Sequence, residues 1–103
     1  MKIINIAKDF SVFPGGRFKK DSEYSAEEFR DTILIPSIKK HNNITIELDG
    51  TRGYSSCFLE EVFGGLIRIG YNKEYINSHI NFISTRKSLI TEIQTYIQDN
   101  KGK

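Results

Sequence analysis

The sequence has 103 residues, which fits one domain with one hydrophobic core and excludes a second catalytic domain. Fifteen Lys and Arg against thirteen Asp and Glu give a formal charge of +2, well short of the basic surface of a dedicated nucleic-acid-binding protein. A single cysteine excludes an internal disulfide, and no apolar run is long enough to cross a bilayer or resembles a signal peptide. We therefore expect a cytoplasmic protein that binds neither nucleic acid nor membranes.

The first part of the chain predicts two strands joined by a turn. Met1 to Ala7 is rich in isoleucine, whose β-branched side chains suit a pleated strand. Pro14, Gly15 and Gly16 supply a turn, because proline fixes φ and glycine accepts a positive φ. Arg17 and Phe18 then resume an extended segment, so the pattern predicts a β-hairpin.

A helix is predicted to start at Ala26. Ser25 and Glu28 have the spacing of a capping box, in which the two side chains satisfy free backbone amides. Apolar residues recur at helical spacing as far as Ile38. Pro36 lacks an amide hydrogen and is expected to kink or divide this helix.

The middle of the chain predicts a strand, a loop and a second helix. Residues Ile44 to Leu48 alternate between apolar and polar side chains, which is the period of a half-buried strand. Asp49 to Gly53 has loop composition, and a helix with an apolar stripe follows from about Ser56. Gly64 and Gly65 weaken a helix, so we expect another backbone to approach closely there.

The last third predicts irregular chain over residues 70–78, a short strand at Ile80 to Phe82 and an amphipathic helix from Leu89 to near Asn100. Residues 98–103 are expected to form a frayed tail. The predicted fold is α/β: one domain over residues 1–103, in the order β-β-α-β-α-β-α, with a small mixed β-sheet and helices packed on it. An exposed edge of this sheet would allow a homodimer.

The residues needed for metal binding or catalysis are sparse. His41, His79 and Cys57 show no ligand spacing, so we expect no metal and no cofactor. Cys57 is interpreted as a small buried residue. No catalytic constellation is visible, and the sequence predicts a protein that is not an enzyme.

Two adjacent serines, Ser55 and Ser56, stand where the predicted second helix begins. One interpretation is that either serine is the N-cap, accepting a hydrogen bond from a free amide and contributing about 1 kcal/mol. The other is that an exposed hydroxyl here is a phosphoacceptor, because helix amides and the positive end of the dipole stabilise a phosphate. Both interpretations can hold together.

The segments around these serines resemble a known family. Ile46 to Asp49, followed after a short loop by Tyr54 to Leu66, is similar to the STAS-like domain family of unknown function. Pro14 to Phe18 and Ser25 to Arg30 fit the same family, so the resemblance covers Phe13 to Arg68. It implies a STAS-like α/β fold.

Through that family the chain is more distantly similar to anti-sigma factor antagonists. In those proteins the second serine of an Asp-Ser-Ser-Gly loop is phosphorylated by a partner of the histidine-kinase-like ATPase fold, and phosphorylation abolishes binding to that partner. The resemblance implies that Ser56 is the equivalent residue. Tyr54, Cys57 and Phe58 differ from that pattern, which has aspartate, glycine and leucine there.

Two functions follow as hypotheses. The first is a non-catalytic regulatory module that binds a protein partner, such as a kinase-type ATPase, through the loop and the helix after it. Its contact residues would be Arg52, Tyr54, Ser55, Ser56 and Phe58. The second is a sensor or sequestering protein for a small anionic ligand such as a nucleotide. Its binding residues would be Gly15, Gly16, Arg17 and Arg52, which requires the two loops to meet.

Overall fold

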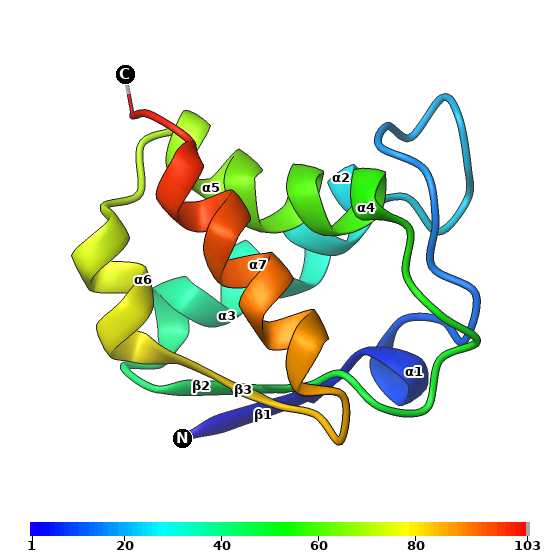
Figure 1. The fold of residues 1–103 in the computed structure, drawn as a ribbon, viewed down its shortest axis with the longest axis horizontal. Helices are drawn as coiled ribbons and strands as arrows, with labels where there is room; N and C mark the ends of the chain where they lie inside the picture. The colour runs from blue at the N-terminus through cyan, green and yellow to red at the C-terminus, as the bar shows by residue number, and fades with distance from the viewer. Residues whose placement is uncertain (103) are drawn as a thin grey trace.

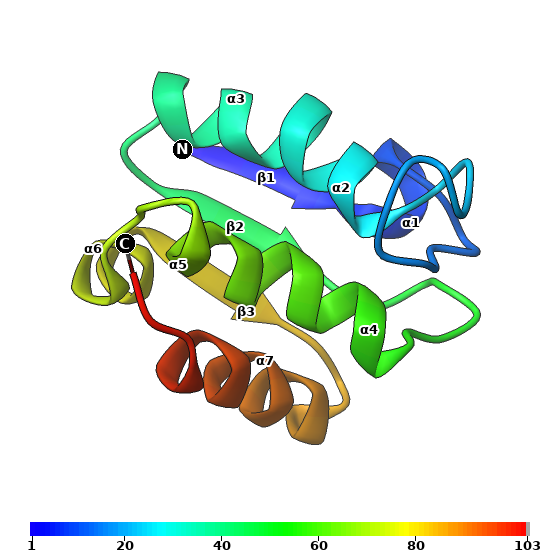
Figure 2. The same cartoon turned by 90° about the horizontal axis from the view of Figure 1, so that it is seen from above.

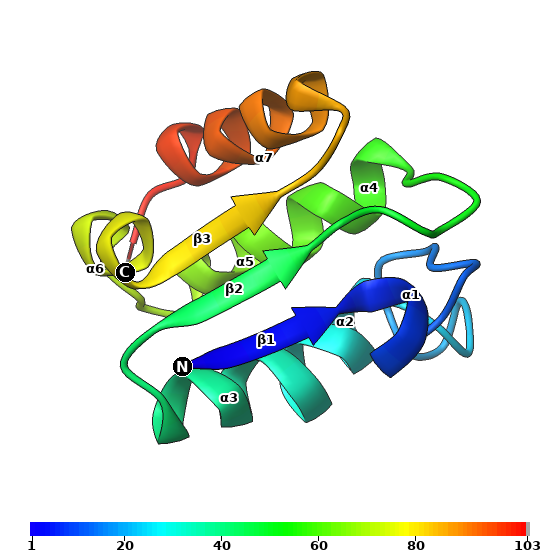
Figure 3. The same cartoon turned by 90° about the horizontal axis from the view of Figure 1, so that it is seen from below.

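Three short strands form the sheet of the computed structural model, which describes residues 1–102; Lys103 lies outside the described residues. The strands are β1 (Lys2–Asn5), β2 (Ile44–Glu47) and β3 (Ile80–Ile83), and they lie side by side in that order. All three are parallel, as Figure 3 shows. Ile4, Ile46 and Phe82 are in register across the sheet. The strand predictions at residues 44–48 and 80–82 are confirmed, and the one at residues 1–7 is confirmed as far as Asn5, because Ile6 and Ala7 begin a helix.

The helices form one layer over one face of the sheet, except the first, which follows β1 directly and lies at the end of that strand (Figures 1 and 2). They are α1 (Ile6–Asp9), α2 (Ala26–Phe29), α3 (Ile35–Lys40), α4 (Ser56–Leu59), α5 (Gly65–Arg68), α6 (Lys73–His79) and α7 (Lys87–Asp99). The opposite face of the sheet is open in the described structure, and Ile3 and Ile83 are half-exposed on it. Among the helices of residues 1–102, none has both the length and the apolar character needed to span a membrane.

Two of these helices continue through a wider, π-helical turn. The turn η1 (Arg30–Leu34) joins α2 to α3, and η2 (Glu60–Gly64) joins α4 to α5. In the first turn the Ile35 amide donates to the Arg30 carbonyl, five residues earlier. Pro36 follows directly and has no amide to donate. The expected disruption at Pro36 is therefore a widened turn next to it, and the helix continues to Lys40.

The hydrophobic core lies between the sheet and the helix layer. Phe29, Phe58 and Phe63 project from the helices and are fully buried. The ring of Phe63 meets that of Phe82 edge-on, with 5.2 Å between the ring centroids. The predicted apolar stripes are confirmed, because most of their residues are buried, namely Ala26, Phe29, Leu34, Ile38, Phe58, Leu59, Val62, Phe63, Leu66, Leu89, Ile93 and Ile97.

The predicted β-hairpin is wrong, because the described segment from residue 10 to residue 25 contains no strand. The carbonyl oxygens of Gly16 and Arg17 instead accept hydrogen bonds from the amides of Ala26 and Glu27, both at 2.9 Å. Those amides begin helix α2 and have no partner inside it. The loop caps a helix instead of pairing with β1. As a result the sheet is parallel and not mixed.

Residues 70–78 are also not irregular, since most of them form α6. The side-chain oxygen of Asn72 accepts from the Tyr75 amide at 3.1 Å and caps this helix. The rings of Tyr75 and His79 stack at 4.1 Å between centroids.

The predicted C-terminal tail is shorter than expected. Helix α7 includes Asp99, so the tail begins later than residue 98. Its last residue lies outside the described structure.

Candidate functional site

The two serines occupy different positions at the start of α4. The Ser55 hydroxyl accepts a hydrogen bond from the Phe58 amide at 3.1 Å, and the Ser55 backbone is extended. Ser55 is therefore the N-cap, and Ser56 is the first helical residue. The capping role that the sequence left open between them belongs to Ser55. The Ser56 hydroxyl is not needed for capping.

Exposure divides the segment into an outer and an inner part. Ser55, Ser56 and Cys57 are exposed, whereas Phe58 is completely buried. The Phe58 ring lies 6.1 Å from that of Tyr54, measured between centroids, and 6.3 Å from that of Phe29. The prediction that Phe58 contacts a partner is therefore wrong: it anchors the start of α4 in the core. The interpretation of Cys57 as a buried residue is wrong too, because the helix turns its side chain outward.

Tyr54 holds the loop that leads to the serines. Its hydroxyl donates to the Leu48 carbonyl at 2.6 Å, so the ring spans from the end of β2 to the start of α4. Burial raises the pKa of Tyr54 to about 12, because a phenolate would lose its hydration there. Tyr54 is half-buried and presents only part of its ring to solvent. The Tyr54 side chain therefore positions the segment that carries Ser55 and Ser56.

Arg52 connects this loop to the loop after α1. Its amide donates to the Val12 carbonyl at 2.7 Å, and its guanidinium lies over the Phe13 ring at 5.6 Å from the centroid. The Phe13 ring is 64% exposed and Val12 is 41% exposed. An apolar patch of Val12 and Phe13 therefore borders the loop. Sequence reasoning missed it, because these two residues stand just before the turn that predicted a hairpin.

Asp49 ties the same loop to the end of β3. Its carboxylate accepts from the Thr85 amide at 2.9 Å and from the Ser84 hydroxyl at 2.8 Å. These two donors, the Thr85 amide first, hold the pKa of Asp49 below its usual range. The loops after α1, β2 and β3 are thus joined at the carboxyl end of the sheet, where α/β proteins commonly bind ligands.

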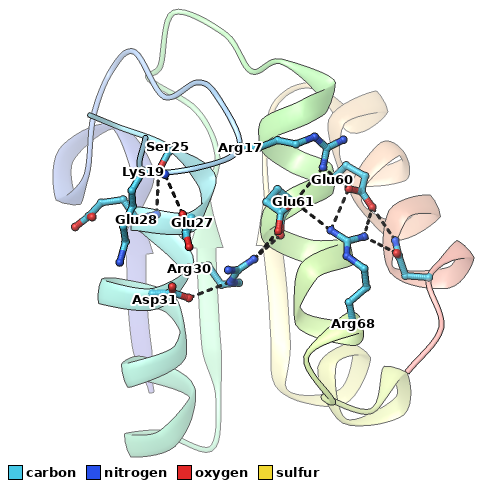
Figure 4. Close-up of polar contacts among 11 residues, drawn as sticks. Arg17, Lys19, Ser25, Glu27, Glu28, Arg30, Asp31, Glu60, Glu61 and Arg68 are labelled. Atoms are coloured by element: carbon cyan, nitrogen blue, oxygen red, sulfur yellow. Dashed lines mark hydrogen bonds and ion pairs between the residues drawn. The ribbon is translucent and has the colours of Figure 1, made fainter. Parts of the chain in front are cut away.

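A cluster of ion pairs lies one turn beyond Ser56, on the outer side of the helix layer (Figure 4). Arg17 Nη1 donates to Glu60 Oε1 at 2.7 Å and to Glu61 Oε1 at 3.1 Å. Arg68 donates to both carboxylates as well, at 2.6 Å to Glu60 Oε2 and 3.3 Å to Glu61 Oε1. Arg30 reaches across from η1 and donates to Glu61 Oε2 at 2.8 Å. Three guanidinium groups thus surround two carboxylates.

This cluster shifts the ionisation of its members. Hydrogen bonds to Glu60 from Arg68, and then from Arg17 and Asn100, lower the pKa of Glu60 to about 2 against the cost of burial. The bond to Glu60 raises the pKa of Arg17 above its already high value. The negative charges of both glutamates are compensated, because three arginines surround two carboxylates and give the group a net charge of +1. The exposed Asp31, which pairs with Arg30, brings the net charge to zero.

The glycine pair of η2 and α5 makes room for this cluster. A Cβ atom on Gly65 would lie 2.6 Å from Arg30 Nη1, and one on Gly64 would lie 2.4 Å from Asn100 Nδ2. The prediction of close packing at the two glycines is confirmed, but the neighbours are polar side chains and not a backbone. Sequence reasoning could not find these partners, which come from other segments.

The residues of the predicted anion site do not gather around one of the grooves found in residues 1–102. Arg17 is held in its ion pairs, and Arg52 lies over Phe13. The Gly15 amide donates to the Tyr24 carbonyl, and Gly16 has a positive φ and contributes its carbonyl to α2. A groove of about 410 Å³ at the ends of β2 and β3 is lined by Arg52, together with Arg86.

The residues with metal-binding or nucleophilic chemistry stay apart. Within residues 1–102, no three His, Cys, Asp or Glu side chains gather in a way that could hold a metal ion. His79 Nδ1 lies 2.9 Å from the Tyr75 carbonyl oxygen. In the same described part of the chain, neither His79 nor His41 makes a hydrogen bond with Ser56 or Cys57. The exposed serine and cysteine have no adjacent histidine base there.

The family comparison covers the segment that contains this site. Residues 25–89, more than half of the chain, match the family model described as a STAS-like domain of unknown function. The match runs from the N-cap of α2 to Leu89 in α7 and includes the loop before α4. Pro14 to Phe18, which carried part of the resemblance in the sequence, lies outside it. No curated protein and no solved structure matches the chain.

Proposed function

Because the chain belongs to the family of STAS-like domains of unknown function, we propose that it is a regulatory binding module without catalytic activity. Its docking surface is the exposed start of α4 with the loop before it, formed by Arg52, Tyr54, Ser55, Ser56 and Cys57. The observation that carries this proposal is the exposed run from Ser55 to Cys57, directly followed by fully buried Phe58. A partner would meet exposed hydroxyl and thiol groups on a rigid base.

The partner in this proposal is a protein, specifically a kinase-type ATPase that also modifies the surface. The Ser56 oxygen would attack the γ-phosphorus of ATP, breaking its bond to the β-phosphate oxygen, so that ADP leaves and the hydroxyl proton goes to solvent. The product carries about −1.5 to −2 charges at Ser56. That charge and volume would disrupt a contact that was built on a neutral hydroxyl.

The side chains around Ser56 make a phosphate there more favourable than it would be beside unpaired glutamates. Glu60 and Glu61 follow within about one turn and would repel it if their charges were free. Both are instead neutralised by Arg17 and Arg68, at distances between 2.6 and 3.3 Å. The positive end of the helix dipole then acts on the phosphate with little opposition. These contacts support Ser56 as the phosphoacceptor.

A test is capture of partners from lysate of the source organism by the tagged chain. Wild type, Ser56→Ala and Ser56→Glu are compared with Ser78→Glu, which adds the same charge at an exposed serine of α6. Helix α6 lies at the opposite end of the sheet from the start of α4 (Figure 1). We expect one ATPase to be captured by all variants except Ser56→Glu, and phosphate to be found on wild-type Ser56 by mass spectrometry.

Exposed Cys57 provides a second, independent readout. A bulky maleimide on its thiol covers the start of α4 without changing any residue, so it should block capture as Ser56→Glu does. A Cys57→Ser chain treated with the same reagent is the control and should still capture the partner. The proposal is wrong if the wild type captures no ATPase, or if Ser56→Glu and the labelled chain capture it as well as the wild type does.

A second candidate is a small anionic ligand such as a nucleotide, favoured by the groove of about 410 Å³ that Arg52 and Arg86 line. Both arginines are exposed and neither makes an ion pair within residues 1–102. Calorimetric titration with ATP tests it: binding should be weakened in Arg52→Gln and in Arg86→Gln, and unaffected in Arg68→Gln. Absence of ATP binding to the wild type removes this candidate.

A further inference from the structure

The strand β3 forms one edge of the sheet, and a groove runs between this edge and helix α7. Figure 3 shows β3 as the outermost strand, with α7 behind and beyond it. The groove measures about 590 Å³ and is larger than the one of about 390 Å³ beside β1, at the other edge. Its position away from the start of α4 makes it independent of the docking surface described above.

The backbone of β3 offers unpaired groups to this groove. Leu48 donates to the Ile83 carbonyl at 2.9 Å, so the backbone groups of Ile83, and those of Asn81 two residues earlier, point toward β2. In a parallel strand the alternate residues point the other way, and the amide and carbonyl of Phe82 therefore face outward. In residues 1–102 they meet no helix, loop or side chain within hydrogen-bonding distance.

The two edges of the sheet are protected differently. At β1 the outward amide of Asn5 donates to the Asp9 carboxylate at 2.8 Å, and Lys2, Lys40 and His41 line the adjacent groove. Charged side chains of this kind are how proteins discourage a further strand from pairing with an edge. The sequence of β3, from Ile80 to Ile83, contains no charged residue. The β3 edge therefore lacks the protection that β1 has.

The groove walls indicate what would fit there. Its floor is apolar, formed by Ile80, Phe82 and Ile90, and its α7 wall carries hydroxyl and amide side chains, which are Thr91, Gln94, Thr95 and Gln98. Lysine and arginine do not line it, and the Asp99 carboxylate stands at one end, beside the Gln98 carbonyl to which the Lys73 ammonium donates from outside the groove. Only an extended backbone presents donors and acceptors at the spacing of an open strand edge.

We propose that this groove binds an extended peptide segment of a partner protein, which adds a strand to β3 and places a basic side chain near Asp99. Main-chain bonds to Phe82 hold the segment, and its alternate apolar side chains contact the floor of the groove. The acidic end of the groove fixes the orientation of the segment.

The test is selection from a phage library of random peptides of about seven residues, long enough to cover one strand. Selected peptides are synthesised and titrated into the wild type, Thr91→Lys and Thr32→Lys. The two threonines are matched: both are exposed, both line a groove beside an edge strand, and each hydroxyl donates to a carbonyl four residues earlier. We expect Thr91→Lys to weaken binding by roughly tenfold or more and Thr32→Lys to leave it unchanged.

Amide hydrogen exchange identifies the bound edge directly. Phe82 should exchange at least about tenfold more slowly with peptide than without, whereas Asn81 and Ile83, already paired to β2, should change little. Enriched sequences should carry lysine or arginine, and Asp99→Lys should remove that preference. The proposal is overturned if no peptide is enriched, if binding is equal in the two threonine variants, or if exchange at Phe82 is unchanged. The proposal would also be overturned if the chain dimerised without peptide and Thr91→Lys abolished the dimer, because the groove would then bind a second copy of the chain.

Discussion

Arg30 and Glu61 are joined twice, because Arg30 Nη1 donates both to the Glu61 carboxylate, at 2.8 Å, and to the Glu61 main-chain carbonyl, at 3.1 Å. Both residues are largely buried, with side chains 9% and 12% exposed. These two hydrogen bonds hold helix turn η1 against η2. They also orient the Glu61 carboxylate, which binds Arg17 and Arg68 as well. The absence of a side chain at Gly65 is what admits the Arg30 guanidinium.

Gly65→Ala should therefore destabilise the protein, although alanine favours a helix by about 1 kcal/mol. The new methyl group would lie 2.6 Å from Arg30 Nη1, which the main-chain carbonyl and the carboxylate of Glu61 hold in place, while Arg30 Nε is held by Asp31. We expect a loss of about 1–3 kcal/mol in the free energy of unfolding, measured by urea denaturation. Gly15→Ala is the control, because no atom lies within 4 Å of its Cβ position, and it should stay within about 0.5 kcal/mol of the wild type. Equal stability of the two variants would contradict this account of Gly65.

Glu60 should make the protein sensitive to acid. Its pKa falls from 4.5 to about 2 on folding, so its ionised form stabilises the folded state fully above about pH 5. This contribution is lost as the pH falls through about 2, and amounts to about 3 kcal/mol in total. Urea denaturation across this range should show a smaller loss for Glu60→Gln than for the wild type. Parallel curves for the two proteins would mean that Arg68 and Arg17 do not hold this carboxylate.

The parts of the fold that sequence patterns predicted are those determined by side-chain periodicity. Ile44 to Leu48 forms a strand as its alternation predicts, and the stripes around Phe29 and Phe58 form the helix faces that cover the sheet. Such patterns depend on which face is buried, and they hold whatever the neighbouring element is. The position of the N-cap at Ser55 was predictable to within one residue for the same local reason.

The missed features depend on contacts that a local pattern does not contain. The hairpin prediction was wrong because the carbonyls of Gly16 and Arg17 accept hydrogen bonds from the first amides of α2. The ion-pair cluster joins Arg17 to Glu60, which is 43 residues away, so only the packing of helices creates it. For α6 a signal did exist, since Asn72 stands three residues before Tyr75 as an N-cap does.

Replacing Ser55 and replacing Ser56 should change the free energy of unfolding by different amounts. Ser55→Ala removes the oxygen that accepts from the Phe58 amide, so we expect a loss of about 1 kcal/mol in the free energy of unfolding. Ser56→Ala changes an exposed residue with no capping role and should stay within about 0.5 kcal/mol of the wild type. Thermal or urea unfolding of both variants tests this. If Ser56→Ala were the more destabilised, Ser56 and not Ser55 would be the structural serine, and the effect of Ser56→Glu on capture would need a folding control.

Tyr54→Phe tests how the loop before α4 is held. It removes the hydroxyl that donates to the Leu48 carbonyl at 2.6 Å, and we expect a loss of about 1 kcal/mol in the free energy of unfolding near neutral pH. The pKa of Tyr54 is raised from 10.0 to about 12 in the folded protein, so its stabilising contribution is complete below pH 10 and is lost as the pH rises through 12.

Urea denaturation of wild type and Tyr54→Phe at about pH 8 and about pH 11 measures both effects, because only the wild type carries the ionisable group at this position. The stability difference between the two proteins should shrink at the higher pH. A Tyr54→Phe chain as stable as the wild type at pH 8 would show that the hydroxyl bond contributes nothing. The orientation of Ser55 and Ser56 would then depend on the burial of Phe58 alone, and Phe58→Leu would become the variant that tests the docking surface.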